Sequence, residues 1–196
     1  MSHHEQKIGL ARNFLVSGGS ICPYVKKYAG QTSFGYVKDL FDQEIRNPVL
    51  DLAKRPEIMA AVYVFDSGLT SHSEERARSV VLFKGLFKIL YIEEHGEQTS
   101  AWLQEADEDL DRAFSPGSNI NPFMGYKGQP FFSIAMNPAY EPTHPRWAPV
   151  SMMAVTRQSD VAAAPIPVRD AIRHEMAERT GSVYDADQLY LMPRAP

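Results

Sequence analysis

The chain has 196 residues, of which 44% are apolar and 22% are charged, and its net charge is −4 with the histidines neutral. These values are typical of a globular chain that folds as one domain, and they argue against disorder. The basic residues are scattered, which argues against nucleic-acid binding, because phosphate contacts need clustered Lys and Arg. We therefore expect a single domain over residues 1–196, with flexible ends at 1–6 and 193–196.

Cysteine content and hydropathy predict the compartment. The single cysteine, Cys22, excludes a disulfide within the chain and a zinc site built from cysteine pairs. The first residues are polar and lack the apolar segment of a secretory signal. No apolar run reaches the ~18 residues of a membrane span. We expect a soluble, cytoplasmic protein that does not act at a membrane.

Helices and strands alternate in the first third of the chain. Residues 5–16 predict a short helix, which a Gly-Gly pair ends. A short strand is expected at 34–37, a helix at 39–54 and a second strand at 60–65. The strand at 60–65 has the clearest signal, because it is short, apolar and rich in β-branched and aromatic residues.

Two helices are expected next. Ser71 or Ser73 is a candidate N-cap for a helix that runs to about residue 94. The second helix, over 99–114, carries several carboxylates, which we interpret as a solvent-exposed face. These are Glu105, Asp107, Glu108, Asp109 and Asp111.

The remaining strong signals are two strands and one helix. Strands are predicted at 130–136 and 150–156, and a helix is predicted at 167–180. The strands are separated by residues 137–149, which contain four prolines and form a longer connection than a hairpin usually has. Together the elements predict an α+β fold, with an antiparallel sheet packed against several helices.

The proline-rich loop 137–149 holds the densest group of candidate functional side chains. Proline restricts the backbone and lowers the entropy that is lost when such a loop is ordered, which suits a binding site. The alternative is a structural crossover that places the tryptophan in the core and the other side chains at the surface. The residues concerned are Asn137, Tyr140, His144, Arg146 and Trp147.

Two residues outside the loop are further candidate ligands. His72 precedes the long predicted helix, where the alternative role is a polar cap. Cys22 lies before Pro23, and it is a candidate nucleophile or haem-thiolate ligand, or else a small buried apolar residue. No pair of histidines has the spacing of a helical zinc site. Haem needs only one axial protein ligand and is therefore compatible with the sequence.

Two stretches resemble the YqcI/YcgG family. Residues 121–140 and 144–149 are similar to that family's Gly-x-Pro turn, apolar strand, Asn-x-Pro-Ala-aromatic run and later Arg. Residues 22–29 look like its cysteine-aromatic-basic segment, with the order of cysteine and proline reversed. The chain departs from the family at 102–107, where no histidine follows the Leu-Gln pair, and at Gln129, which replaces an acidic residue. The chain thus resembles a divergent member.

The resemblance implies a haem-dependent monooxygenase that oxidises the nitrogen of a small amino-acid-like substrate in specialised metabolism, because some relatives are haem N-oxygenases. On this basis His144 is the first choice of axial iron ligand and His72 the second. Arg146 is expected to pair with a haem propionate and Tyr140 to act as a ligand or distal donor. Cys22 and Trp147 complete the expected cofactor-binding set.

The same resemblance suggests six apolar residues that would line the porphyrin pocket. Ordinary core packing is the alternative role for all of them. They are Phe83, Phe87, Phe131, Met136, Met152 and Met153. Two other functions are left open. One is a haem or small-molecule carrier without turnover, and the other is a cofactor-free interaction protein that uses the proline-rich loop as its interface. The expected partner is a small-molecule substrate, bound by a monomer or a homodimer.

Overall fold

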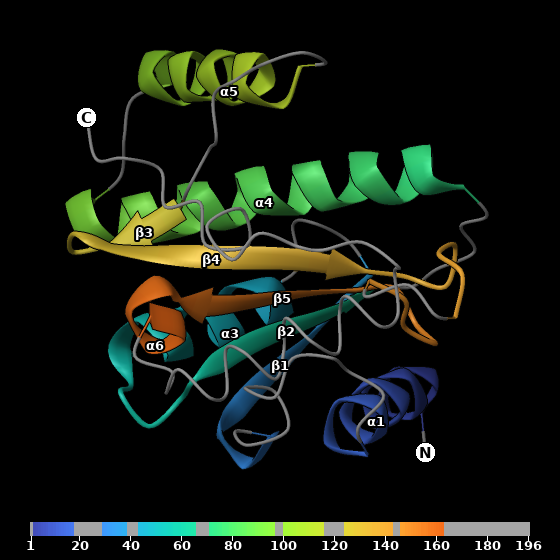
Figure 1. Ribbon diagram of the computed structural model, residues 1–196. Coiled ribbons are helices and arrows are strands. Elements are labelled where there is room, and N and C mark those ends of the chain that lie inside the picture. Colours follow the sequence, from blue (N-terminus) through green and yellow to red (C-terminus); the bar gives the residue numbers. More distant parts are fainter. Residues whose placement is uncertain are drawn as a thin grey trace.

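A computed structural model describes most of the first 162 residues of the chain (Figure 1). The described elements form one sheet with helices on both of its faces. The described residues are 2–17, 29–38, 43–65, 71–96, 100–115, 124–142 and 146–162. The predicted helix at 167–180 and Cys22 lie outside them.

The sheet has five strands in the order β1-β2-β5-β4-β3. The pair β1–β2 is parallel, and the other three pairs are antiparallel. The strands are β1 (Thr32–Val37), β2 (Ala60–Phe65), β3 (Met124–Tyr126), β4 (Gln129–Met136) and β5 (Met152–Arg157). The predicted α+β class is therefore confirmed, with one parallel pair in a mostly antiparallel sheet.

The parallel pair has a simple cause. The helix α3 (Gln43–Lys54) connects β1 to β2, and a connection that contains a helix returns the chain to the same end of the sheet, which makes the two strands parallel. The β3–β4 connection, in contrast, is a tight turn at Lys127-Gly128. Both residues have positive φ, as the two-residue hairpin turn that matches the strand twist requires.

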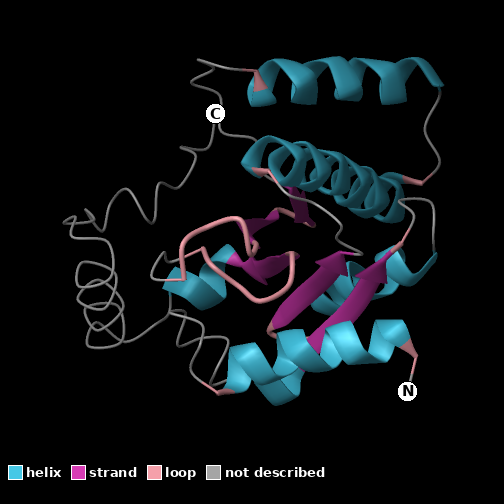
Figure 2. Cartoon of the chain, turned by 90° about the vertical axis from the view of Figure 1, so that its right-hand side faces the viewer, coloured by secondary structure: helices cyan, strands magenta, loops and turns pink. Residues whose placement is uncertain are grey.

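Helices cover both faces of the sheet (Figure 2). The helices α3 and α4 (His72–His95) pack on one face, and α1 (His3–Val16) packs on the other. The helix α5 (Ser100–Phe114) lies outside α4 as a further layer (Figure 1). The short elements η1 (Ala29–Gln31) and α6 (Gln158–Ala162) precede β1 and follow β5.

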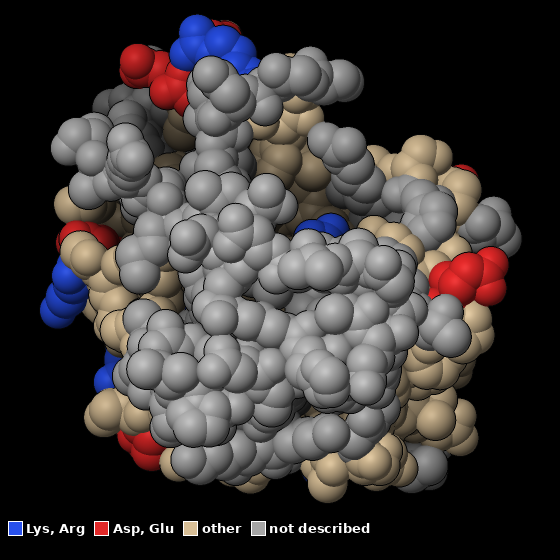
Figure 3. All heavy atoms as spheres, viewed as in Figure 1, with Lys and Arg blue, Asp and Glu red and all other residues tan. Residues whose placement is uncertain are grey.

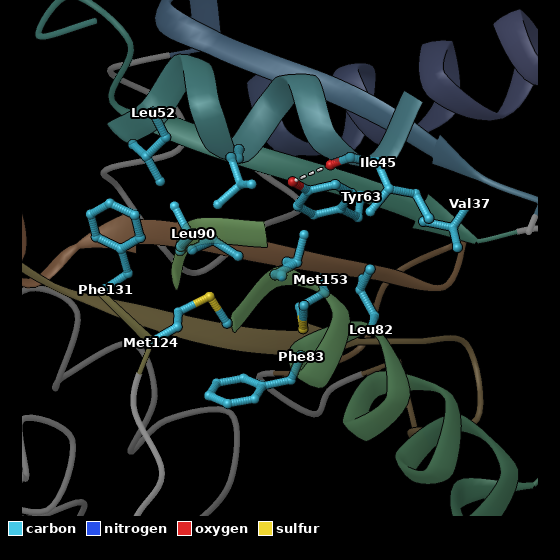
Figure 4. Close-up of a cluster of buried hydrophobic side chains, with 14 of the residues drawn as sticks. Val37, Ile45, Leu52, Tyr63, Leu82, Phe83, Leu90, Met124, Phe131 and Met153 are labelled. Atoms are coloured by element: carbon cyan, nitrogen blue, oxygen red, sulfur yellow. Dashed lines mark hydrogen bonds between the residues drawn. The ribbon is translucent and has the colours of Figure 1, made fainter. Parts of the chain in front are cut away.

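Two apolar clusters fill the space on either side of the sheet. The first lies between the sheet and α3 and α4 (Figure 4) and includes Leu52, Tyr63 and Leu90. The second lies between the sheet and α1 and includes Phe14 and Val64. Because neighbouring side chains of a strand point to opposite faces, β2 contributes to both clusters, and all six of its residues are buried.

The ends of α1 and α4 have clear sequence causes. The Ser2 side chain accepts a hydrogen bond from the Glu5 N–H, and the Glu5 carboxylate accepts one from the Ser2 N–H. This capping box starts α1 within the stretch that we expected to be flexible. Ser71 caps α4, as predicted, and Gly96 ends it with a φ of +84°.

The helix α3 contains a proline, Pro48, and Tyr63 of the sheet contacts the helix backbone near it. The Tyr63 hydroxyl donates to the Ile45 carbonyl at 2.9 Å inside the core (Figure 4). Burial raises the pKa of Tyr63 well above its usual value, and a backbone hydrogen bond from Val49 opposes that rise. The hydroxyl thus supplies polar contacts to the helix backbone beside the residue that lacks an N–H.

One buried cation ties β5 to the end of α3. The Arg157 guanidinium is 7% exposed and donates to the carbonyls of Leu52, Arg55 and Ile58. It also pairs with Asp160 of α6 at 3.1 Å. The last carbonyls of a helix have no partner within the helix, so this arginine acts as its cap from the neighbouring strand.

The observed elements match most of the predicted ones within a few residues. The strand β2 has the predicted bounds, whereas β3 and α6 were not predicted, because three- and five-residue elements give little periodicity. The acidic face of α5 is only partly solvated, since Asp107 and Asp111 pair with lysines of α4. Within the described part of the chain, no helix combines the length and apolar character that a bilayer crossing requires.

Candidate functional site

The candidate site lies at one end of the sheet, which we call the loop end. The strands β1, β2 and β4 end there, and β5 begins there. The register shows this, since Val64 of β2 pairs with Tyr36 of β1 and with Met152 of β5, and Met152 also pairs with Met136 of β4. A hydrogen bond of 2.9 Å from the Phe65 N–H to the Ser151 carbonyl continues the pairing. The proline-rich loop 137–149 leaves and re-enters the sheet at this end.

Asn137 closes the base of the loop. Its N–H donates to the Arg146 carbonyl at 3.0 Å, and its carbonyl accepts from the Ala148 N–H at 3.3 Å. Its side-chain oxygen accepts from the Ala139 N–H at 3.0 Å, which forms a local turn. Asn137 is 5% exposed. It is therefore a structural clamp that holds the two ends of the loop together, a role that its position directly after a strand does not reveal in the sequence.

Trp147 packs inward from the loop. It bridges to Asn137 through the backbone, and its ring meets the Phe14 ring of α1 edge-on, with the centroids 5.7 Å apart. The tryptophan is half-buried against the second apolar cluster. Arg146 beside it is exposed, and Tyr140 is half-buried. An inward Trp147 and an exposed Arg146 are what we expected if the loop is a structural crossover. The same positions would place Arg146 and Tyr140 at the rim of a binding site in this loop.

The chain position of His72 lies toward the same end. His72 is the first residue of α4. The far end of α4 is fixed at the opposite end of the sheet, where the Lys127 N–H donates to the Glu94 carboxylate at 2.6 Å. The start of α4 therefore points toward the loop end (Figure 1). Cys22 and His144 lie outside the described residues.

The six apolar residues expected to wall a porphyrin do not lie together. Phe83, Phe131 and Met153 belong to the cluster between the sheet and α4, and Phe87 packs against it. Met136 and Met152 belong to the cluster between the sheet and α1. The sheet separates the two sets, so they form no common wall, and core packing is the role that the structure gives them.

Charged groups do not build a metal site among the described residues, where no three carboxylate, histidine or cysteine side chains come together. The charged side chains seen on the face in Figure 3 form small separate groups, and their described atoms make no basic stripe on that face.

His4 packs against Tyr36 of the second cluster, although its place near the start of the chain predicted a frayed residue. Its ring stacks on the Tyr36 ring of β1 with the centroids 4.1 Å apart. The capping box of α1 fixes this end of the helix and so holds the imidazole over the sheet.

The chain was compared with family models, curated proteins and solved structures. The chain matches no family model, no curated protein and no solved structure. The resemblance to the YqcI/YcgG family therefore stays a hypothesis that depends on the residues of the two stretches themselves.

Proposed function

We propose that the chain binds haem at the loop end of the sheet and oxidises a nitrogen of a small amino-acid-like substrate in the cytoplasm. The observation that supports this proposal is convergence. The described ends of the loop 137–149 lie at that end, Trp147 of the loop packs on Phe14 of α1, and the start of α4 lies toward the same end (Figure 1). In the sequence, the candidate ligands belong to these segments or adjoin them. Ligand sites commonly form where several loops leave a rigid sheet together.

One described residue supports the proposal at the polar rim of a haem. Arg146 carries an exposed guanidinium on a loop that Asn137 clamps, and this group is suited to pair with a propionate. His144, or else His72, would hold the haem iron, and Tyr140 would hold the iron or donate a hydrogen bond in the pocket. When bound, haem iron supplies the activated oxygen that oxidation of an N–H group needs. The protein's contribution is to orient the substrate and to keep water out.

The apolar wall that the sequence suggested does not fit, because its six members lie on opposite faces of the sheet. This observation favours a second candidate function, in which the loop is a cofactor-free protein interface. Trp147 and Arg146 are of the residue types that carry binding energy at such interfaces. A haem carrier without turnover is the third possibility.

The cofactor is tested by its absorbance. The protein is purified from cells supplied with a haem precursor, and the expected result is a Soret band at near-stoichiometric haem. The holoprotein is then incubated with amino acids, a reductant and dioxygen, and mass spectrometry is expected to detect a product with one added oxygen atom, the second oxygen leaving as water.

Each alternative predicts a different result. A Soret band that no substrate changes, without any oxygenated product, favours the carrier. Absence of haem, together with a partner that co-purifies with the wild type but not with Trp147→Ala, favours the interaction protein. Either of the last two outcomes contradicts the proposed oxygenase.

A further inference from the structure

The helix α5 is an outer layer that is attached to the molecule through α4 (Figures 1 and 2). Among the side chains that the structure describes, its apolar contacts come from its C-terminal half. Leu110 and Ala113 are buried, and the Phe114 ring meets the Phe83 ring of α4 edge-on with the centroids 5.2 Å apart. Among the side chains that the structure describes toward its N-terminal half, Gln104 and Glu105 are exposed. The described part of the apolar contact thus lies near one end of this 15-residue helix.

Two ion pairs add to this apolar contact. The Lys88 ammonium pairs with the Asp107 carboxylate at 2.5 Å, and the Lys84 ammonium pairs with the Asp111 carboxylate. The spacing of four residues on both helices lets the two pairs form side by side. Both lysines belong to α4, and both carboxylates belong to α5.

The exposure of these four side chains is unequal. Lys84 and Lys88 are 17% and 27% exposed, whereas Asp111 and Asp107 are 68% and 40% exposed. The lysines thus lie largely covered, while their partners are open to solvent. Dissolved ions screen a pair that has one solvent-exposed partner, so the attachment should weaken as ionic strength rises.

We propose that α5 is a salt-labile latch on α4. It detaches as one unit while α4 and the sheet stay folded, and it uncovers a surface of α4 formed by Phe83, Lys84 and Lys88. Parts of a protein with few buried apolar contacts open at a lower free energy than the core. Among the described side chains, α5 contributes only Leu110 to the buried residues of the first cluster, whereas α4 contributes Leu82, Phe83, Leu86 and Leu90. This inference does not depend on the proposed haem function.

Hydrogen exchange of the full chain, followed by mass spectrometry, tests the latch. In the wild type we expect the amides of α5 to exchange faster than those of α4, with a difference that grows between low and high salt. The double variant Asp107→Asn/Asp111→Asn should raise exchange in α5 at low salt by roughly five- to thirtyfold, the effect of losing two partly covered ion pairs. Its exchange should no longer respond to salt.

A matched control separates the latch from a general effect of charge. Glu105→Gln/Asp109→Asn removes the same charge from α5, but Glu105 is exposed and Asp109 pairs with Arg112 inside the helix. This variant should exchange as the wild type does. The proposal is overturned if the control behaves like the double variant, or if α5 and α4 exchange together at every salt concentration. Lys84→Met/Lys88→Met provides a second test from the α4 side and should reproduce the loss of salt response.

Discussion

At the scale of single residues, the fold depends on polar side chains that form hydrogen bonds with backbone groups of a helix or a loop. Arg157 caps the end of α3 from β5, Tyr63 contacts the backbone of α3 beside its proline, and Asn137 clamps the loop 137–149. None of these roles can be read from the sequence, because each partner lies far away along the chain or depends on a turn. The hydrophobic pattern predicts where the elements are, but it does not predict which polar side chain satisfies their ends.

Tyr63 makes a prediction about alkaline stability. The unfolded phenol releases its proton near pH 10, but burial keeps the folded pKa well above that value. The raised folded pKa contributes stability that is fully present below pH 10 and is lost as the pH rises above it, by up to about 1.4 kcal/mol per pH unit. Tyr63→Phe should remove this part of the loss.

The measurement is the free energy of unfolding from urea titrations between pH 8 and about pH 11. At pH 8 Tyr63→Phe should cost about 1–2 kcal/mol, because the Ile45 carbonyl loses a buried donor. The control is Phe65→Leu, a change in the same strand and the same cluster without a titrating group. It should lower stability by a similar amount at every pH. A wild-type curve and a Tyr63→Phe curve with the same alkaline slope would contradict this account.

At the scale of elements, α4 is the organising helix. It covers the first apolar cluster with Leu82, Leu86 and Leu90, and its Glu93 receives Arg46 and Lys54 of α3. Hydrogen bonds from these two cations lower the pKa of the Glu93 carboxyl. The length of this helix and its two caps were predictable, because Ser71 and Gly96 are strong local signals. Its ion pairs with α3 and α5 were not, since they join separate parts of the chain.

The β3–β4 hairpin makes a prediction at this scale. A side-chain carbon at Gly125 would lie 2.8 Å from the Gln129 carbonyl oxygen across the turn, too close for the backbone to accept without moving. We expect Gly125→Ala to destabilise the protein by about 1–3 kcal/mol, as overpacking does. The matched control is Gly9→Ala in α1, where an added carbon meets nothing within 4 Å. It should be neutral or stabilise by about 0.5–1 kcal/mol.

Thermal or urea unfolding of the two alanine variants measures both effects. Equal stabilities for Gly125→Ala and Gly9→Ala would mean that the hairpin is not packed as described. A loss confined to Gly125→Ala supports the close approach of β3 to the turn.

At the scale of the whole molecule, the α+β class followed from the alternation of strand and helix signals. The sheet was predicted to be antiparallel, and its single parallel pair, which was not predicted, results from the helix between β1 and β2. The site was predictable only in part. The sequence indicated the loop 137–149 as a candidate site. It could not show that the six apolar candidates lie on two faces of the sheet, because the face to which a strand residue points is known only once the strand register is known.

If haem binds at the loop end of the sheet, its retention should depend on histidines there and not on histidines at the other end. In the sequence His144 belongs to the loop 137–149, whose described ends lie at the loop end, whereas His95 lies at the last turn of α4, at the opposite end. Wild type, His144→Ala and His95→Ala are purified in parallel from haem-supplied cells, and their Soret absorbance per protein is compared. The account predicts a strong band in the wild type and in His95→Ala, and a lost or shifted band in His144→Ala. A wild type without haem, or an unchanged spectrum in His144→Ala beside a lost one in His95→Ala, would contradict it.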